Sequence, residues 1–206
     1  MLNPDGVEYQ IHGVDSENLL YSRLITMNHG SNDFSKWQAN ARGVDLNHNY
    51  PTGFWKYKML EKNGGIEGGA PTGYSGETPE SEPEVGAISN FLRYNESIID
   101  GVLTLHTQGE EIYFQSADRI LPGAWSTAKN ISEITGYRLG QADGTVPCGG
   151  LTEWCIEELG LPSFTLKCGT GPNPLSTKDF FTNYIRLRKL FFSFPTLLAR
   201  RTLPME

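Results

Sequence analysis

The sequence lacks several features that would place it in other protein classes. It contains no run of about 18 apolar residues, so no membrane-spanning helix and no membrane partner are expected. The opening MLNPDGVEYQ has no basic segment followed by an apolar one, so no secretory signal peptide is predicted. Basic residues are few, because 17 Lys and Arg stand against 24 Asp and Glu. The net charge of -7 argues against a nucleic-acid partner.

Cysteine is sparse as well. The chain has three cysteines, Cys148, Cys155 and Cys168, and they form no CxxC pair. Such an odd and sparse set is typical of reduced thiols, so a cytoplasmic location is expected. The 206 residues, 38% hydrophobic and 20% charged, have an ordinary globular composition and can bury a core. We therefore predict one domain over residues 1–206.

Strand-like and helix-like segments alternate along this domain. Strands are predicted over residues 6–12, 98–106, 111–115 and 163–168. Helices are predicted over residues 82–94, 125–135, 151–159 and 177–200. Polar, loop-like stretches occupy residues 28–44 and 63–83. The alternation indicates an α/β fold with a mixed, mostly parallel sheet flanked by helices.

Two of the predicted helices carry further signals. Ser81 is the expected N-cap of the helix over residues 82–94, with a glutamate three residues later. One face of that helix is apolar and consists of Val85, Ile88, Phe91 and Leu92. Pro195 is expected to bend or break the helix over residues 177–200, because proline lacks the backbone N–H that an interior helical position uses.

His106 is the first candidate for chemistry. It ends the apolar run IIDGVLTLH and is followed by Thr107, Gln108 and Gly109. Ligands of open α/β sheets bind outside the carboxyl ends of the strands, and a neutral imidazole there can be a metal ligand. The same position also suits a hydrogen-bonded histidine that binds no metal.

Two more segments carry polar groups in informative places. Residues 42–51 gather Arg, Asn and His side chains that could hold a carboxylate or polarise a carbonyl, or form a loop of Asx-turns. Lys167 lies in the apolar strand over residues 163–168, where an ammonium is costly to bury. The alternative is that Lys167 extends along the sheet to reach water.

Taken together, these segments resemble the carboxypeptidase A-like zinc peptidases. The matching segments, in order, are NPDGVEY (3–9), ARGVDLNHNYP (41–51), LTLHTQG (103–109), GGLTEW (149–154) and PSFT (162–165). The form PSFTLKCGTGPNPL is most similar to bacterial peptidases that cut γ-D-glutamyl-diamino acid bonds of cell-wall peptides. The resemblance implies zinc-dependent hydrolysis of a peptide or muropeptide substrate.

The resemblance also implies roles for particular residues. His106 corresponds to the third zinc ligand, and Asn47 to a residue that holds the terminal carboxylate of the substrate. Arg42 is the candidate for the arginine that polarises the scissile carbonyl. Thr152 and Glu153 fall in the segment that lines the pocket for the terminal side chain. Glu153 suits the free amine of a diamino acid, and it equally suits the first turn of a helix.

The sequence departs from the family at the metal site. The family's first two zinc ligands lie in an H-x-x-E motif upstream of the NPDG turn, and here Met1 and Leu2 precede that turn. The chain has four histidines and no H-x-x-E motif. These features are expected for an N-terminally truncated domain that lacks its first strands and binds zinc weakly or not at all, since a catalytic zinc normally has three protein ligands.

Two substitutions within the matching motifs point the same way. Lys167 stands where the family has its catalytic glutamate, and an ammonium accepts no proton and repels Zn²⁺. His48 stands where the family has a carboxylate-binding arginine and lacks its bidentate fork, although Arg23 or Arg42 could substitute. The sequence therefore predicts a metallopeptidase that is inactive in this form. The alternative is a non-catalytic, peptide-binding pseudoenzyme or gene remnant.

Overall fold

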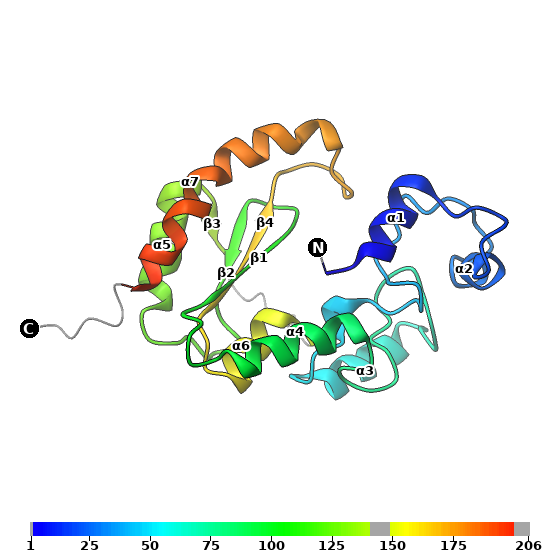
Figure 1. Cartoon of the computed structure of the whole chain (residues 1–206), viewed down its shortest axis with the longest axis horizontal. Coiled ribbons are helices and arrows are strands. Elements are labelled where there is room, and N and C mark those ends of the chain that lie inside the picture. Colours follow the sequence, from blue (N-terminus) through cyan, green and yellow to red (C-terminus); the bar gives the residue numbers. More distant parts are fainter. Residues whose placement is uncertain (1, 141–148, 200–206) are drawn as a thin grey trace, which may run out of the picture. The chain divides into compact units, whose positions relative to one another are not determined.

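Figure 1 shows the computed structural model of the chain. The residues that it describes are 2–140 and 149–199. These residues form two compact units, which are residues 2–94 with 149–151 and residues 95–140 with 152–199. Whether the whole chain forms one domain stays a prediction, and Cys148 lies outside the described residues.

The first unit is built from helices joined by long loops. Its helices are α1 (Pro4–His12), α2 (Tyr21–Met27), the 3-10 helix η1 (Leu46–His48), α3 (Phe54–Asn63) and α4 (Pro83–Tyr94). One core cluster of this unit consists of Leu24, Met27, Phe34, Trp37 and Ala39. The two predicted loop stretches are loops in the structure, over residues 28–44 and 64–82 apart from short turns.

Helix α1 corrects a prediction, because residues 6–12 were expected to form a strand. Asn3 caps this helix, and its side-chain oxygen accepts a hydrogen bond from the Gly6 N–H at 3.0 Å. Pro4 occupies the first helical turn, where a missing N–H has no consequence. The capping signal therefore outweighs the alternation of apolar residues that suggested a strand. Tyr9 packs its ring against Trp37, with centroids 6.2 Å apart.

Helix α4 lies where it was predicted, but two details of that prediction are wrong. The helix begins at Pro83, so Ser81 lies too early to be its N-cap. The Ser81 hydroxyl instead donates to the Glu82 carboxylate at 2.8 Å. Val85 and Leu92 are buried as expected, whereas Phe91 is 58% exposed.

The second unit holds a mixed sheet. Its described strands are β1 (Val102–Thr107), β2 (Glu111–Tyr113), β3 (Arg138–Leu139) and β4 (Ser163–Cys168), in the order β1-β4-β2-β3. Strand β4 is parallel to β1 and antiparallel to β2, and β2 is parallel to β3. The predicted strand over residues 163–168 is confirmed, and so is the expectation of an α/β fold with a mixed, largely parallel sheet.

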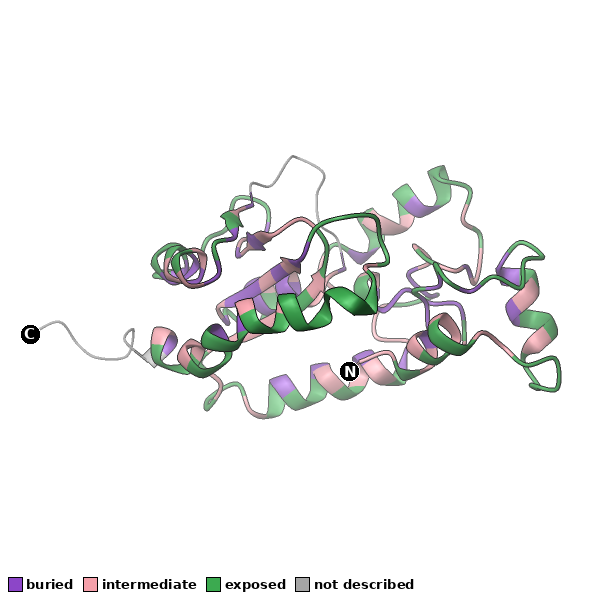
Figure 2. Ribbon diagram, turned by 90° about the horizontal axis from the view of Figure 1, so that it is seen from above, coloured by how far each residue is buried: buried purple, intermediate pink, exposed green. Residues whose placement is uncertain are grey.

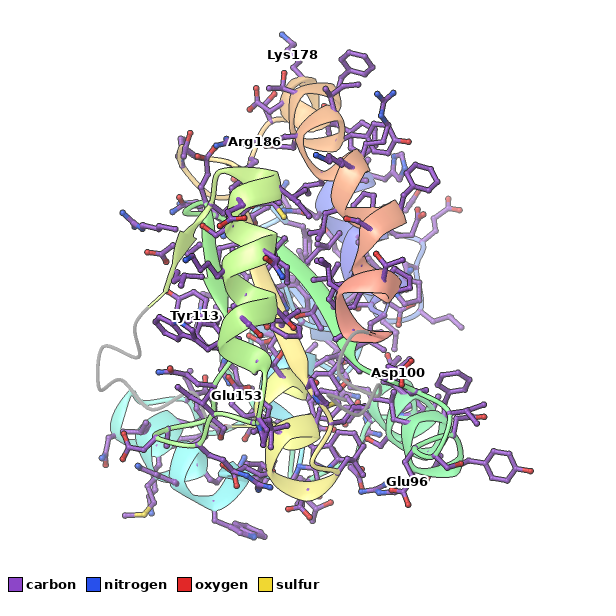
Figure 3. The ribbon with its side chains drawn as sticks, turned by 90° about the vertical axis from the view of Figure 1, so that its left-hand side faces the viewer. Glu96, Asp100, Tyr113, Glu153, Lys178 and Arg186 are labelled. Carbon is purple, nitrogen blue, oxygen red and sulfur yellow. The ribbon has the colours of Figure 1, made fainter. Side chains whose placement is uncertain are left out.

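Helices cover one face of this sheet. The helices of the second unit are α5 (Ala124–Thr135), α6 (Leu151–Glu158), η2 (Thr177–Asp179) and α7 (Phe180–Ala199). Figure 3 shows α5 and α7 side by side in front of the strands. Their apolar side chains form a core with Ile112, Phe164 and Leu166 of the sheet, all of which are fully buried. Figure 2 shows the strands mainly as buried or half-buried.

Helix α7 is continuous, which corrects one part of its prediction. Pro195 lies inside the helix, and the helical conformation continues past it to Ala199. Arg186 joins the helix to the end of α5, since its Nε donates to the Thr135 carbonyl at 2.8 Å and its guanidinium pairs with Glu110. None of the helices in the described ranges combines the length and apolar character needed to span a bilayer.

Candidate functional site

His106 and Lys167 lie side by side on neighbouring strands. They are register partners in the parallel pair of β1 and β4, and Lys167 is in turn the register partner of Glu111 on β2. Register partners of adjacent strands project from the same face of a sheet. The sheet therefore places an imidazole, an ammonium and a carboxylate in one row, with the ammonium in the middle.

The core holds this row in place. Strand β4 alternates strictly after its first residue, with Phe164, Leu166 and Cys168 buried and Thr165 and Lys167 half-buried. The three buried side chains belong to the core beneath α5 and α7. Sliding β4 by one residue would bring Lys167 into that core, which would be very unfavourable. Hydrophobic burial thus directs Lys167 to the opposite face of the sheet.

Glu111 already has partners of its own. The Tyr113 hydroxyl donates to Oε2 at 2.6 Å, and Arg138 Nε donates to Oε1 at 2.7 Å. The Tyr113 hydrogen bond, together with the charges of Arg138 and Lys167, holds the pKa of Glu111 below its ordinary value, although burial opposes the shift. Glu111 is therefore ionised at neutral pH, and its charge is balanced mainly by Arg138.

A line of hydroxyl groups lies one step along the same face. Thr165 Oγ1 is 2.8 Å from Thr104 Oγ1 and 2.7 Å from Thr152 Oγ1. Thr104 and Thr165 precede His106 and Lys167 by two residues, so the four side chains share one face. Thr152 is buried in the first turn of α6, and the neighbouring Glu153 is half-buried in that turn. The structure thus connects the predicted pocket segment to the predicted catalytic strand.

Asp45 organises the loop that contains the other candidates. Its Oδ1 accepts hydrogen bonds from the backbone N–H of Asn47 at 3.2 Å and from Nδ2 of Asn47 at 3.1 Å. Its Oδ2 accepts from Thr72 Oγ1 at 3.0 Å and from the Gly73 N–H at 2.9 Å. Asn47 itself is exposed. The buried carboxylate therefore holds the Asn47 side chain at the surface in a defined position.

Arg42 lines a cavity in the first unit. The cavity has a volume of about 260 Å³, and its lining also includes Arg23, Tyr74 and Glu82. Arg42 Nε is 3.7 Å from a carboxylate oxygen of Glu82, and the Arg42 side chain is 58% exposed whereas that of Glu82 is 1% exposed. Burial and nearby carboxylates, Glu77 first among them, raise the pKa of Tyr74. Glu67 and Glu77 also line the cavity, so its walls combine cationic and anionic side chains.

His48 is held by its ring and by its backbone. The imidazole stacks on Tyr57, with centroids 3.8 Å apart and planes 8° from parallel. Gly149 lies against the His48 backbone, and a Cβ on this glycine would approach the His48 carbonyl oxygen to 2.5 Å. Tyr50 and Thr52 form backbone hydrogen bonds with Gly149 at 3.0 and 2.7 Å. The predicted carboxylate-binding loop and the start of the pocket segment are thus joined.

The candidates divide between the two units. Arg42, Asn47 and His48 belong to the first unit. His106, Thr152, Glu153 and Lys167 belong to the second, and the structure brings His106 next to Lys167 there. The roles proposed for all seven residues stay predictions.

Sequence reasoning missed the groups around Lys167. Glu111, Tyr113 and Arg138 were not singled out, although Glu111 and Tyr113 alternate along a predicted strand. Thr104 and Thr165 were missed too, although each precedes a candidate by two residues. A period-of-two rule applied to the predicted strands would have placed both threonines on the candidate face.

The described residues do not by themselves fit a catalytic zinc ion. Within residues 2–140 and 149–199, no group of three or more His, Cys, Asp or Glu side chains could hold a metal ion. A catalytic zinc normally has three protein ligands. The ammonium of Lys167, beside His106, would also oppose the charge of Zn²⁺. Among these residues there is therefore no metal site beside which Arg42 and Lys167 could take the catalytic roles predicted for them.

The chain is similar in sequence to known peptidases. It is 34% identical over 193 residues to Gamma-D-glutamyl-L-diamino acid endopeptidase 1 of Lysinibacillus sphaericus, covering 94% of this chain and 47% of the relative. It also resembles the murein-tripeptide amidase MpaA of Escherichia coli O157, with a TM-score of 0.50 at 25% identity over 82% of this chain and 62% of that one. The chain spans about half the length of the curated relatives that match nearly all of it.

The fold has solved counterparts at lower sequence identity. The carboxypeptidase A of Helicoverpa armigera superposes with a TM-score of 0.61 at 14% identity, covering 97% of this chain and 49% of that one. This likeness confirms the architecture of the sheet and its helices. The family model described as zinc carboxypeptidase matches residues 1–181. A match of that extent shows that the chain belongs to the zinc carboxypeptidase family.

Proposed function

We propose that this chain binds peptides of the kind that its family hydrolyses and does not hydrolyse them itself. The observation that carries the proposal is Lys167, which lies between His106 and Glu111 in one row across the sheet. The substrate class is a peptide or cell-wall peptide with a γ-D-glutamyl amide bond, which is the bond type in the name of the Lysinibacillus sphaericus relative. We propose a bacterial source and a cytoplasmic location on the same basis and on the sparse cysteines.

The absence of hydrolysis follows from the chemistry of this row. Amide hydrolysis by an activated water needs a group that accepts the proton of that water. An ammonium has no lone pair to accept it. Glu111, in the same row, has its two oxygens hydrogen-bonded to Tyr113 and Arg138 and a lowered pKa, so it is a weak base. Neither Lys167 nor Glu111 is therefore a well-suited general base, and His106, the third group of the row, is the proposed metal ligand rather than the proposed base.

Peptide recognition depends on the first unit. Asn47 is exposed and is fixed by Asp45, so its remaining amide groups face solvent with little freedom to lose on binding. Arg42 forms one ion pair among the described residues, a contact of 3.7 Å through Nε, so its terminal nitrogens remain for a carboxylate. These two side chains are the proposed contacts for the acidic end of the peptide.

A second candidate function is active metallopeptidase chemistry, with metal ligands supplied from outside these 206 residues. The match to the zinc carboxypeptidase family over residues 1–181 favours it. It requires His106 as a ligand and a general base other than Lys167. The two candidates make opposite predictions for turnover in the presence of zinc.

Both candidates are tested with a fluorescent γ-D-glutamyl-diaminopimelate peptide. Binding is measured by anisotropy, and hydrolysis is followed by chromatography with and without added zinc. We expect saturable binding that Arg42→Ala weakens several-fold and no hydrolysis. Lys62→Ala, which removes an exposed cation that is absent from the cavity lining, should bind as well as the unmodified chain. Zinc-dependent turnover that His106→Ala abolishes would replace this proposal with the second candidate.

A further inference from the structure

The surroundings of the Lys167 side chain bear on what the sheet face can bind. Its side chain leaves the middle strand of the row, between His106 on β1 and Glu111 on β2. Lys167 as a residue is half-buried, so its side chain is partly covered by its neighbours and partly reachable from water. A cation in such a place needs a counter-charge, because partial desolvation is unfavourable for an unpaired ion.

The neighbouring carboxylate does not supply that counter-charge through direct contact. Glu111 pairs with Arg138 and accepts a hydrogen bond from Tyr113, and no contact within 4.0 Å joins it to Lys167. Among the described residues, no carboxylate forms an ion pair with Lys167 and no acceptor takes a hydrogen bond from it. Glu111 is paired with Arg138, so among the residues that the structure describes no carboxylate contacts Lys167 directly.

The rest of the face is suited to a polar ligand. The Thr104, Thr165 and Thr152 hydroxyls continue along the face from Lys167 and His106. Successive residues on one face of a strand lie about 6.6–6.8 Å apart, a spacing that a short peptide spans. Tyr113, labelled in Figure 3, lies on the same side of β2 as Glu111 and adds an aromatic edge to the face.

We infer that the ammonium of Lys167 is a binding site for a carboxylate of a peptide ligand. The resemblance places a carboxylate of the protein at this position in the family. In this chain the position carries a cation, which would attract an anionic group of the ligand. A charge-assisted hydrogen bond from an ammonium to a carboxylate is among the stronger polar contacts in proteins. The inference rests on the proposed peptide-binding function and adds the group of the ligand that this face recognises.

The test compares two peptides that differ only in whether their carboxylates are free or amidated. The intact chain is titrated with the fluorescent peptide bearing free carboxylates and with the same peptide in its fully amidated form. We expect the free form to bind about tenfold more tightly or better, as a hydrogen bond to a charged group implies. Lys167→Met, which keeps the apolar stem and removes the charge, should lower this preference by about tenfold, and any preference that is left is the part that Arg42 supplies. Lys167→Arg should keep most of the preference.

A matched control and a competitor complete the experiment. Lys178→Met removes an exposed lysine of the same unit and should leave the preference unchanged. Inorganic phosphate at the peptide's concentration should not compete, and competition that depends on Lys167 would show a general anion site and overturn the peptide assignment. A preference equal in Lys167→Met and the unmodified chain would overturn this inference alone. If neither peptide binds, the proposed function fails and this inference fails with it.

Discussion

Replacing Asp45 by asparagine tests how the candidate binding loop is held. The change keeps the size and shape of the side chain and replaces one carboxylate oxygen by an NH₂ group. Asp45 is 2% exposed and accepts four hydrogen bonds, two at each oxygen. Three of the four partners are N–H groups, which can only donate. The new NH₂ group of Asp45→Asn must therefore face at least one donor, whichever way the amide is turned.

The size of the effect follows from this count. A hydrogen bond to a charged group contributes about 1.5–3 kcal/mol, and an unsatisfied buried donor costs about 1–3 kcal/mol. Thr72 can rotate its hydroxyl to accept from the amide, so the more favourable amide orientation leaves the Gly73 N–H without its partner. We expect Asp45→Asn to lower the free energy of unfolding by about 2–4 kcal/mol.

Urea denaturation followed by tryptophan fluorescence measures this loss. With a denaturant slope of about 2 kcal/mol per M, the midpoint should fall by about 1–2 M at an unchanged slope. Asp15→Asn is the control, because exposed Asp15 accepts one backbone hydrogen bond, from Glu17 at 2.9 Å, that an asparagine oxygen also accepts. That variant should stay within about 0.5 kcal/mol of the unmodified chain. If Asp45→Asn did the same, the proposed role of Asp45 in fixing Asn47 would be refuted.

Three further outcomes are expected. After dialysis the chain should retain far less than one zinc per molecule by elemental analysis, and near-stoichiometric zinc that is lost on His106→Ala would contradict the poor fit to a metal. Gly149→Ala should destabilise by about 1–3 kcal/mol more than Gly65→Ala in urea, because both glycines have positive φ but only Gly149 lies against the His48 backbone. Burial raises the pKa of Cys155 to about 11 and also raises that of Cys168, so mass-spectrometric mapping at pH 8 should find both unalkylated until the chain unfolds.

The sequence predicted an element correctly where the alternation of apolar and polar residues arises from burial of one face. Strand β4 was predicted to the residue, because apolar side chains alternate with Thr165 and Lys167 between a preceding proline and a following glycine. Helix α3 was not predicted at all. Its apolar residues Trp55, Met59 and Leu60 are more than half exposed, so their spacing does not mark a buried face.

Helix α1 shows how two local signals compete. Val7, Tyr9 and Ile11 alternate with polar residues as they would in a half-buried strand. The structure follows the cap at Asn3 instead, which fixes the start of a helix by a specific hydrogen bond. Ile11 is 60% exposed in this helix, so the alternation did not reflect a buried face. A capping signal, when present, is thus the better guide over such a short segment.

The neighbours of the Lys167 side chain could not be predicted from the sequence. The identity of the residue is visible in the strand, and so is its departure from the family pattern. Whether that ammonium is compensated depends on Glu111 and Arg138, which lie 56 and 29 positions away in the sequence and meet through the pairing of β2 with β4 and β3. Had Glu111 paired with Lys167, the position would be a closed ion pair. Because Glu111 pairs with Arg138 and Tyr113, no carboxylate in the described part of the chain contacts Lys167, and this contact pattern is the ground for the carboxylate site proposed above.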